Sequence, residues 1–143
     1  MTNVEETTAP IVVGVDGSES SIEALRRART IAEAVHRPVR AVTAWHLPAF
    51  TGGGALAYGW DPLGDAQLVL DDALLEAYGS ASPEGVTTEV VEGTTAAALI
   101  AASEGAFMLV VGSRGHGGFA GLLLGSVSAA VAEHATCPVL IVH

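Results

Sequence analysis

Five short apolar blocks recur along the 143-residue chain and predict β-strands. They are Ile11–Val15, Val39–Trp45, Val86–Val91, Phe107–Gly112 and Pro138–Val142. Several of these blocks are almost continuously hydrophobic instead of alternating with polar residues. That pattern is typical of strands that are buried on both faces of a parallel sheet.

Helical stretches lie between the apolar blocks. They are Ser20–Val35, Asp65–Tyr78, Thr94–Ser103 and Ser126–His134. Ser20 and Glu23 have the spacing of a capping box, Pro38 ends the first stretch, and Gly79 ends the second. The alternation predicts an α/β fold, an open five-stranded parallel sheet with helices on both faces. Such sheets bind ligands at the carboxyl ends of their strands, but the pattern does not give the strand order.

Residues 46–64 interrupt this alternation. The segment carries five glycines, two prolines and three aromatic residues, and it is long for a connection without secondary structure. It can be a variable insertion, which is the default interpretation, a lid over a site, or a partner-binding loop. We expect one domain over residues 10–143, preceded by a flexible segment of residues 1–9.

Composition narrows the classes of function. Half of the residues are hydrophobic and 15% are charged, as expected of a folded globular domain. The net charge is −10 and there is no lysine, which argues against a nucleic-acid or anionic membrane surface. No apolar run approaches the roughly 18–20 residues of a membrane span, and the polar N-terminus does not resemble a secretory signal, so we expect a cytoplasmic protein. The single cysteine, Cys137, excludes an intramolecular disulfide and a cysteine-based zinc site.

The segment Gly112–Ser126 carries the candidate chemistry. Six glycines fall within its first fourteen residues, and it joins the fourth apolar block to the last helical stretch. Glycine lets backbone N–H groups approach a ligand, and a helix N-terminus adds donors and a partial positive charge. Ser126 stands at the expected N-cap, where its hydroxyl can cap the helix or bind a phosphate. Arg114 is the only Lys or Arg after residue 40 and is a candidate anion ligand; the alternatives are a solvated arginine and a merely flexible loop.

Two common phosphate-binding motifs are excluded. A Walker A loop needs a lysine, and the chain has none. The first strand–helix turn, Gly14–Ser18, lacks the three-glycine spacing of a dinucleotide-binding turn.

The spacing of the glycines resembles a longer motif. Gly112, two residues, Gly115, nine residues and then Gly125-Ser126 is similar to the nucleotide-binding motif of ATP-type universal stress proteins. The opening strand and turn, Ile11–Ser18, and the closing strand, Cys137–Val142, also resemble that family, so the resemblance covers roughly residues 10–143. The chain departs from the family at Thr95, where proline is common, and at Ala106-Phe107, where an acidic residue is usual. We expect both departures to lie away from the motif.

The resemblance implies an adenine nucleotide α-hydrolase-like fold with strand order 3-2-1-4-5. It implies bound ATP, with any Mg²⁺ held through the phosphates, and a homodimer built through the last strand, Val139–Val142. Residue by residue, it places Asp16 at the ribose and Gly14 and Val15 in the same pocket. It places Thr43 and Ala44 at the adenine, Val111, Gly112, Arg114 and Gly115 at the ribose and phosphates, and Gly125, Ser126, Val127 and Ser128 at the phosphate-binding helix start. Asp16 can also be an ordinary turn or cap residue.

Three functions remain open: a nucleotide-dependent regulatory module of the stress response, a slow ATP-hydrolysing enzyme, and a nucleotide-free structural dimer that binds partner proteins. Hydrolysis needs a base or a water-positioning group and usually a metal. The glycine-rich motif contains no acidic residue. We therefore expect ATP binding, at most weak hydrolysis, no catalytic residue and no protein-held metal.

Overall fold

The computed structural model describes residues 8–46, 61–114 and 124–143. In chain order these ranges form β1 (Ile11–Gly14), α2 (Glu19–Val35), β2 (Val39–Trp45), α4 (Pro62–Tyr78), β3 (Val86–Glu92), α5 (Thr95–Ser103), β4 (Met108–Gly112), α6 (Ser126–His134) and β5 (Val139–Val142). The predicted strands and helices are all present, with ends that differ by up to three residues. No helix in the described ranges is both long enough and apolar enough to cross a membrane.

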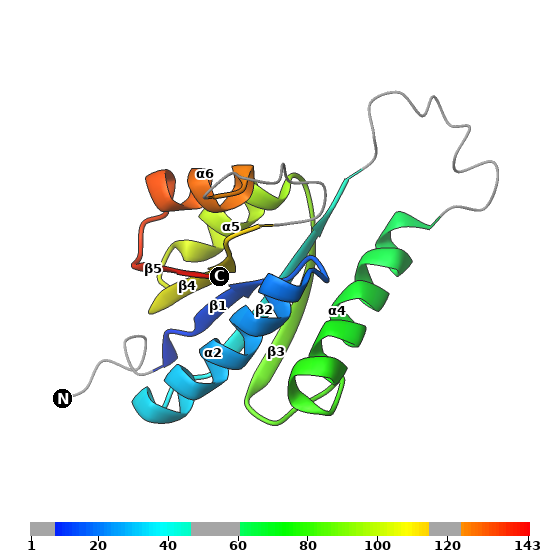
Figure 1. Ribbon diagram of the computed structural model, residues 1–143, viewed down its shortest axis with the longest axis horizontal. Coiled ribbons are helices and arrows are strands. Elements are labelled where there is room, and N and C mark those ends of the chain that lie inside the picture. Colours follow the sequence, from blue (N-terminus) through cyan, green and yellow to red (C-terminus); the bar gives the residue numbers. More distant parts are fainter. Residues whose placement is uncertain (1–7, 47–60, 115–123) are drawn as a thin grey trace.

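The strands form one parallel sheet in the order β3-β2-β1-β4-β5, as the family resemblance implies. Helices α2 and α4 cover one face of the sheet, and α5 and α6 cover the other (Figure 1). From β1 the chain turns toward β2 and β3, and after β3 it returns to build β4 and β5 on the opposite side. The carboxyl ends of β1 and β4 therefore flank the topological switch point, where open α/β sheets bind ligands.

Strand β1 shows why the apolar blocks are continuous. Ile11, Val12 and Val13 are fully buried. Ile11 and Val13 belong to the cluster under α2 and α4, whereas Val12 belongs to the cluster under α5 and α6. A central strand with helices on both faces buries successive side chains in opposite directions, so it has no polar face.

Helix α2 begins one residue earlier than predicted. Its N-cap is Ser18, whose hydroxyl oxygen accepts a hydrogen bond from the Ser21 N–H (3.2 Å). The expected capping box of Ser20 and Glu23 is therefore wrong. The Ser20 hydroxyl instead donates to the Arg114 carbonyl oxygen at 2.5 Å, a contact across 94 residues that no local pattern predicts.

Helix α4 also begins earlier than predicted. Asp61 is its N-cap and accepts from the Gly64 N–H at 3.0 Å, while Pro62 occupies the first turn, where its missing N–H costs nothing. The end of the predicted loop 46–64 is thus helical. Residues 47–60 of that loop lie outside the described residues. Gly79 ends the helix in the left-handed conformation, as expected of a C-terminal glycine.

Candidate functional site

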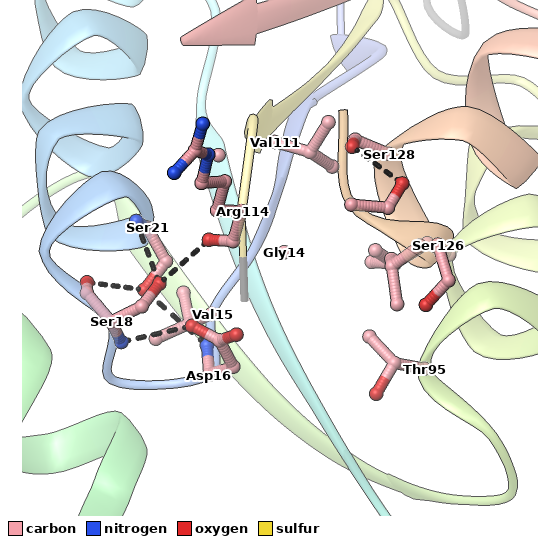
Figure 2. Close-up of a pocket in the computed structure, with 14 residues that line it drawn as sticks. Gly14, Val15, Asp16, Ser18, Ser21, Thr95, Val111, Arg114, Ser126 and Ser128 are labelled. Carbon is pink, nitrogen blue, oxygen red and sulfur yellow. Dashed lines mark hydrogen bonds between the residues drawn. The ribbon is translucent and has the colours of Figure 1, made fainter. Parts of the chain in front are cut away.

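A pocket of about 320 Å³ opens at the carboxyl ends of β1 and β4 (Figure 2). Its volume falls at the lower end of the range that is usual for small-molecule sites. Most of the predicted site residues line it: Gly14, Val15 and Asp16 after β1, Val111, Gly112 and Arg114 at the end of β4, and Gly125, Ser126, Val127 and Ser128 at the start of α6. The fold thus brings the end of β1 together with two segments that lie far along the chain from it, the end of β4 and the start of α6.

Three predicted site residues are not among those that line the pocket. Gly115 lies outside the described residues. Thr43 and Ala44 pair with β3, beyond the point where β1 ends. The Thr43 side chain is buried, and its hydroxyl donates to the Val15 carbonyl oxygen at 2.8 Å. Thr43 therefore holds the backbone of Val15, which lines the pocket.

Asp16, Ser18 and Ser21 form the α2 side of the pocket (Figure 2). The Ser18 N–H donates to Asp16 Oδ1 at 2.9 Å, a local turn typical of aspartate. The Asp16 N–H approaches Ser21 Oγ at 3.4 Å. The second carboxylate oxygen, Asp16 Oδ2, has no hydrogen-bond partner among the described residues. Asp16 can therefore hold the turn with one oxygen and accept from a ligand hydroxyl with the other, so the two roles considered from the sequence are compatible.

The glycines at the ends of β1 and β4 are required by packing. A Cβ on Gly112 would lie 2.3 Å from Ser20 Oγ and 2.8 Å from the Ser20 carbonyl carbon, on the α2 face of the sheet. A Cβ on Gly14 would lie 2.6 Å from Leu99 Cδ1 on α5, on the opposite face. Both helices approach the strand ends closely because these positions lack side chains, which lets the helix starts border the pocket.

The backbone of Arg114, a residue that lines the pocket, is held against α2. Its carbonyl oxygen accepts from the hydroxyls of Ser20 (2.5 Å) and Ser18 (3.4 Å), which fixes the start of the glycine-rich segment against α2. Figure 2 shows the guanidinium pointing away from Thr95 and Ser126. In this conformation the Arg114 side chain does not face the start of α6, where an anion was expected.

The start of α6 differs from the expected arrangement. Gly125, not Ser126, is the N-cap, and no side chain in the described part of the chain caps the helix. Ser126 is the first helical residue and is exposed. Ser128 is buried, and its hydroxyl is within hydrogen-bond distance of the carbonyl oxygens of Ser113 (3.0 Å) and Gly125 (3.1 Å). The described residues thus offer the first-turn N–H groups no side-chain acceptor, and a helix N-terminus in this state attracts anions.

The sequence model of the universal stress protein family matches residues 8–143. The chain belongs to the universal stress protein family. A universal stress protein of Mycobacterium tuberculosis strain H37Rv is 35% identical over 93% of this chain. That match covers 47% of the mycobacterial protein, so the chain spans about half the length of this curated relative.

Two solved structures of universal stress proteins are similar. UspA from Lactobacillus plantarum has a TM-score of 0.79 at 20% identity, over 94% of this chain and 97% of that chain, and it shows the shared fold. A universal stress protein in complex with cAMP has a TM-score of 0.71 at 33% identity, over 96% of this chain and 98% of that chain. The predicted adenine nucleotide α-hydrolase-like architecture is confirmed.

Four residues of this universal stress protein line the pocket without having been predicted: Ser18, Ser21, Thr95 and Leu99. Thr95 was expected to lie away from the motif, and that expectation is wrong. Helix α5 packs Leu99 against Gly14, which carries its first residue, Thr95, to the pocket. A signal was present in the sequence, because Thr95 follows a predicted strand and the carboxyl ends of parallel strands share one edge of the sheet.

Few of the residues that line the pocket are charged, although many are polar. Asp16 and Arg114 are the ionisable residues among those that line it. Within residues 8–46, 61–114 and 124–143, no three histidine, cysteine, aspartate or glutamate side chains gather in a way that can hold a metal ion. Hydroxyls, backbone groups and one carboxylate are therefore the polar groups that the described lining offers to a ligand.

Proposed function

We propose that this universal stress protein binds an adenine nucleotide, specifically ATP, in the pocket between β1 and β4, and acts as a nucleotide-dependent regulatory module of the stress response. The observation that carries the proposal is that the start of α6 and Asp16 Oδ2 share one pocket and that, among the described residues, neither has a side-chain hydrogen-bond partner. One group suits a phosphate and the other suits a ribose hydroxyl. The cAMP complex of a relative that is 33% identical supports an adenine nucleotide as the ligand.

The pocket residues suggest how the nucleotide is oriented. The phosphates would lie at the N–H groups of Ser126, Val127 and Ser128, and the ribose at Asp16, with the base beside Val15. Any Mg²⁺ would be held mainly by phosphate oxygens and water, as Mg²⁺ commonly is, since Asp16 is the one carboxylate in the described lining.

We further propose that two copies associate along β5, the last strand in the sheet order. Its hydrophobic side chains Val139, Leu140 and Ile141 are only partly buried within one chain. An apolar edge strand with free backbone groups is a template for pairing with a second chain.

Nucleotide binding is tested first on the purified protein. We expect adenine nucleotide in the supernatant after denaturation of freshly purified protein, and calorimetric binding of added ATP. An empty supernatant together with no heat of ATP binding would contradict the proposal and favour the nucleotide-free dimer. Release of ADP from added ATP during the same measurement would support slow hydrolysis instead.

The position of the phosphates is tested with Ser126→Asp. A carboxylate in the first turn of α6 is favourable for the helix dipole, so we expect the melting temperature to be unchanged or higher. The same carboxylate repels phosphate, so the affinity should fall by about tenfold for ATP, less for AMP and not at all for adenosine. Calorimetric titrations with the three ligands measure this series.

The matched control is Ser126→Asn, which has nearly the same size and no charge. We expect it to bind ATP within about threefold of the unmodified protein, a difference well below one kcal/mol. If Ser126→Asp bound ATP as tightly as Ser126→Asn, the phosphates would not lie at the start of α6.

A further inference from the structure

Two hydroxyl groups on the α5–α6 side of the pocket have no hydrogen-bond partner among the described residues. They belong to Thr95, the first residue of α5, and Ser126, the first residue of α6. Figure 2 draws both side chains on the same side of the pocket, across from Asp16 and Ser18, and no dashed line reaches either. This side of the pocket therefore holds unused hydrogen-bond donors.

The opposite side of the pocket is already occupied by internal hydrogen bonds. Ser18 Oγ accepts from the Ser21 N–H, and the Ser21 hydroxyl donates to the Ser18 carbonyl oxygen at 3.0 Å. These hydroxyls hold the turn into α2 and are not free to rotate toward a ligand. Hydroxyl donors for an anionic group are thus concentrated at the starts of α5 and α6.

The Thr95 hydroxyl has no role in forming its own helix. Thr94 is the N-cap of α5, and its hydroxyl oxygen accepts from the Ala97 N–H at 3.3 Å. A threonine inside a helix commonly donates to a carbonyl of the preceding turn. Thr95 is the first helical residue and has no preceding turn, so this internal partner does not exist. The half-buried Thr95 side chain lines the cavity, and none of the described residues accepts a hydrogen bond from its hydroxyl.

We propose that Thr95 is a specificity-determining residue whose hydroxyl donates a hydrogen bond to a phosphate oxygen of the bound nucleotide. The proposal rests on the function proposed above. The two helix starts place partial positive charge beside the Thr95 and Ser126 hydroxyls, so an anionic oxygen is a better acceptor there than a neutral sugar or base. Thr95 thereby favours a nucleotide over the corresponding nucleoside.

The test compares Thr95→Val with Thr95→Ser. Valine keeps the shape of threonine and removes the hydroxyl, whereas serine keeps the hydroxyl. We expect Thr95→Val to weaken binding of AMP and ATP by about tenfold or more and to leave adenosine affinity unchanged, because a hydrogen bond to a charged group is lost. Thr95→Ser should bind all three ligands like the unmodified protein.

Thr94→Val is the matched control. This variant removes the neighbouring hydroxyl, which caps α5. Thr94 is not among the residues that line the pocket. We expect Thr94→Val to lower the melting temperature and to keep the affinity for AMP at a temperature where the protein is folded. A loss of affinity confined to Thr95→Val separates a ligand contact from general damage to α5.

The outcomes distinguish this inference from the function on which it rests. If the unmodified protein bound none of the three ligands, the proposed function would fail. If the unmodified protein bound AMP and Thr95→Val bound it equally well, only the inference about Thr95 would fail. An equal loss of adenosine and AMP affinity would place the hydroxyl at the ribose or base and overturn its assignment to phosphate.

Discussion

At the scale of single residues, Gly14 and Gly112 show how packing and ligand binding meet at one place. Each ends a strand beside the pocket, and each faces a different helix. Glycine content in this region suggested close approach of a ligand. The contacts show close approach of a helix as well, and they differ in kind. Gly112 faces both the side chain and the backbone of Ser20, whereas Gly14 faces only the end of the Leu99 side chain.

This difference predicts unequal costs for Gly112→Ala and Gly14→Ala. The new methyl group on residue 112 meets helix backbone that cannot move alone, so we expect a loss of about 2–3 kcal/mol in the free energy of unfolding. The methyl group on residue 14 meets a flexible leucine tip, so the loss should be about 1 kcal/mol. Urea denaturation of both variants measures the two losses.

A second readout follows for Gly14→Ala. Leu99 lines the pocket and must shift to admit the new methyl group, so ATP affinity should fall although most of the stability is kept. If Gly14→Ala were the more destabilising of the two variants, Leu99 would not yield more easily than the Ser20 backbone, and the predicted order of the two losses would be wrong.

At the scale of elements, Tyr78 fixes α4 against α2. Its hydroxyl donates to the Leu25 carbonyl oxygen, and the Arg29 guanidinium carbon lies 5.0 Å from the centre of its ring. Burial raises the pKa of Tyr78 to about 12, and the positive charge of Arg29 opposes this rise. The neutral phenol is therefore the form that the packed helices favour.

The raised pKa predicts a loss of stability at alkaline pH. The contribution of the neutral phenol is fully present below the unfolded pKa near 10 and is lost as the pH rises through 10 toward 12. The chain has no lysine, so few other groups titrate in this range. We expect Tyr78→Phe to lower stability at pH 8 by about 1 kcal/mol, because the Leu25 carbonyl loses its donor.

The same variant should flatten the decline between pH 10 and 12, since phenylalanine does not ionise. Urea denaturation at several pH values from 8 to 11.5 tests both effects. An equally steep alkaline decline in Tyr78→Phe would show that a group other than Tyr78 is responsible.

Local sequence signals were sufficient to locate some of the elements but not all of their ends. Continuous apolar blocks located every strand, and Gly79 marked the end of α4, because both signals act within a few residues. The start of α2 was misplaced because three serines, Ser18, Ser20 and Ser21, compete for the cap. Ser18 caps the helix, while the Ser20 hydroxyl bonds the carbonyl oxygen of Arg114, a residue that is distant in sequence.

At the scale of the whole molecule, the sheet order leaves β5 at one edge. The carbonyl oxygens of Pro138 and Val142 accept from N–H groups of the β4 side. Since backbone groups alternate in direction along a strand, the N–H and carbonyl of Ile141 point away from β4. These outward groups are the ones that pairing with a second copy would use.

Ile141→Pro tests the proposed dimer. Proline removes an N–H that faces outward and leaves the bonds to β4 in place, so the fold should be kept. We expect light scattering to give twice the 14.4 kDa protomer mass for the unmodified protein and the protomer mass for Ile141→Pro. Ile141→Val keeps the N–H and should remain dimeric. A monomeric unmodified protein, or a dimeric Ile141→Pro variant, would refute pairing along β5.

The sequence by itself determined the class of fold, the elements and the glycine-rich segment, because apolar periodicity and turn residues are local properties of the chain. It also marked most of the residues that line the pocket, through spacing that resembles a known family. Only the tertiary structure decided which groups remain available to a ligand. The hydroxyls of Ser18, Ser21 and Ser128 form hydrogen bonds within the fold, whereas those of Thr95 and Ser126 have no partner in the described ranges. The local pattern does not contain this outcome, because it depends on packing between separate segments: Ser128 bonds the Ser113 carbonyl oxygen, and the approach of α5 to Gly14 brings Thr95 to the pocket.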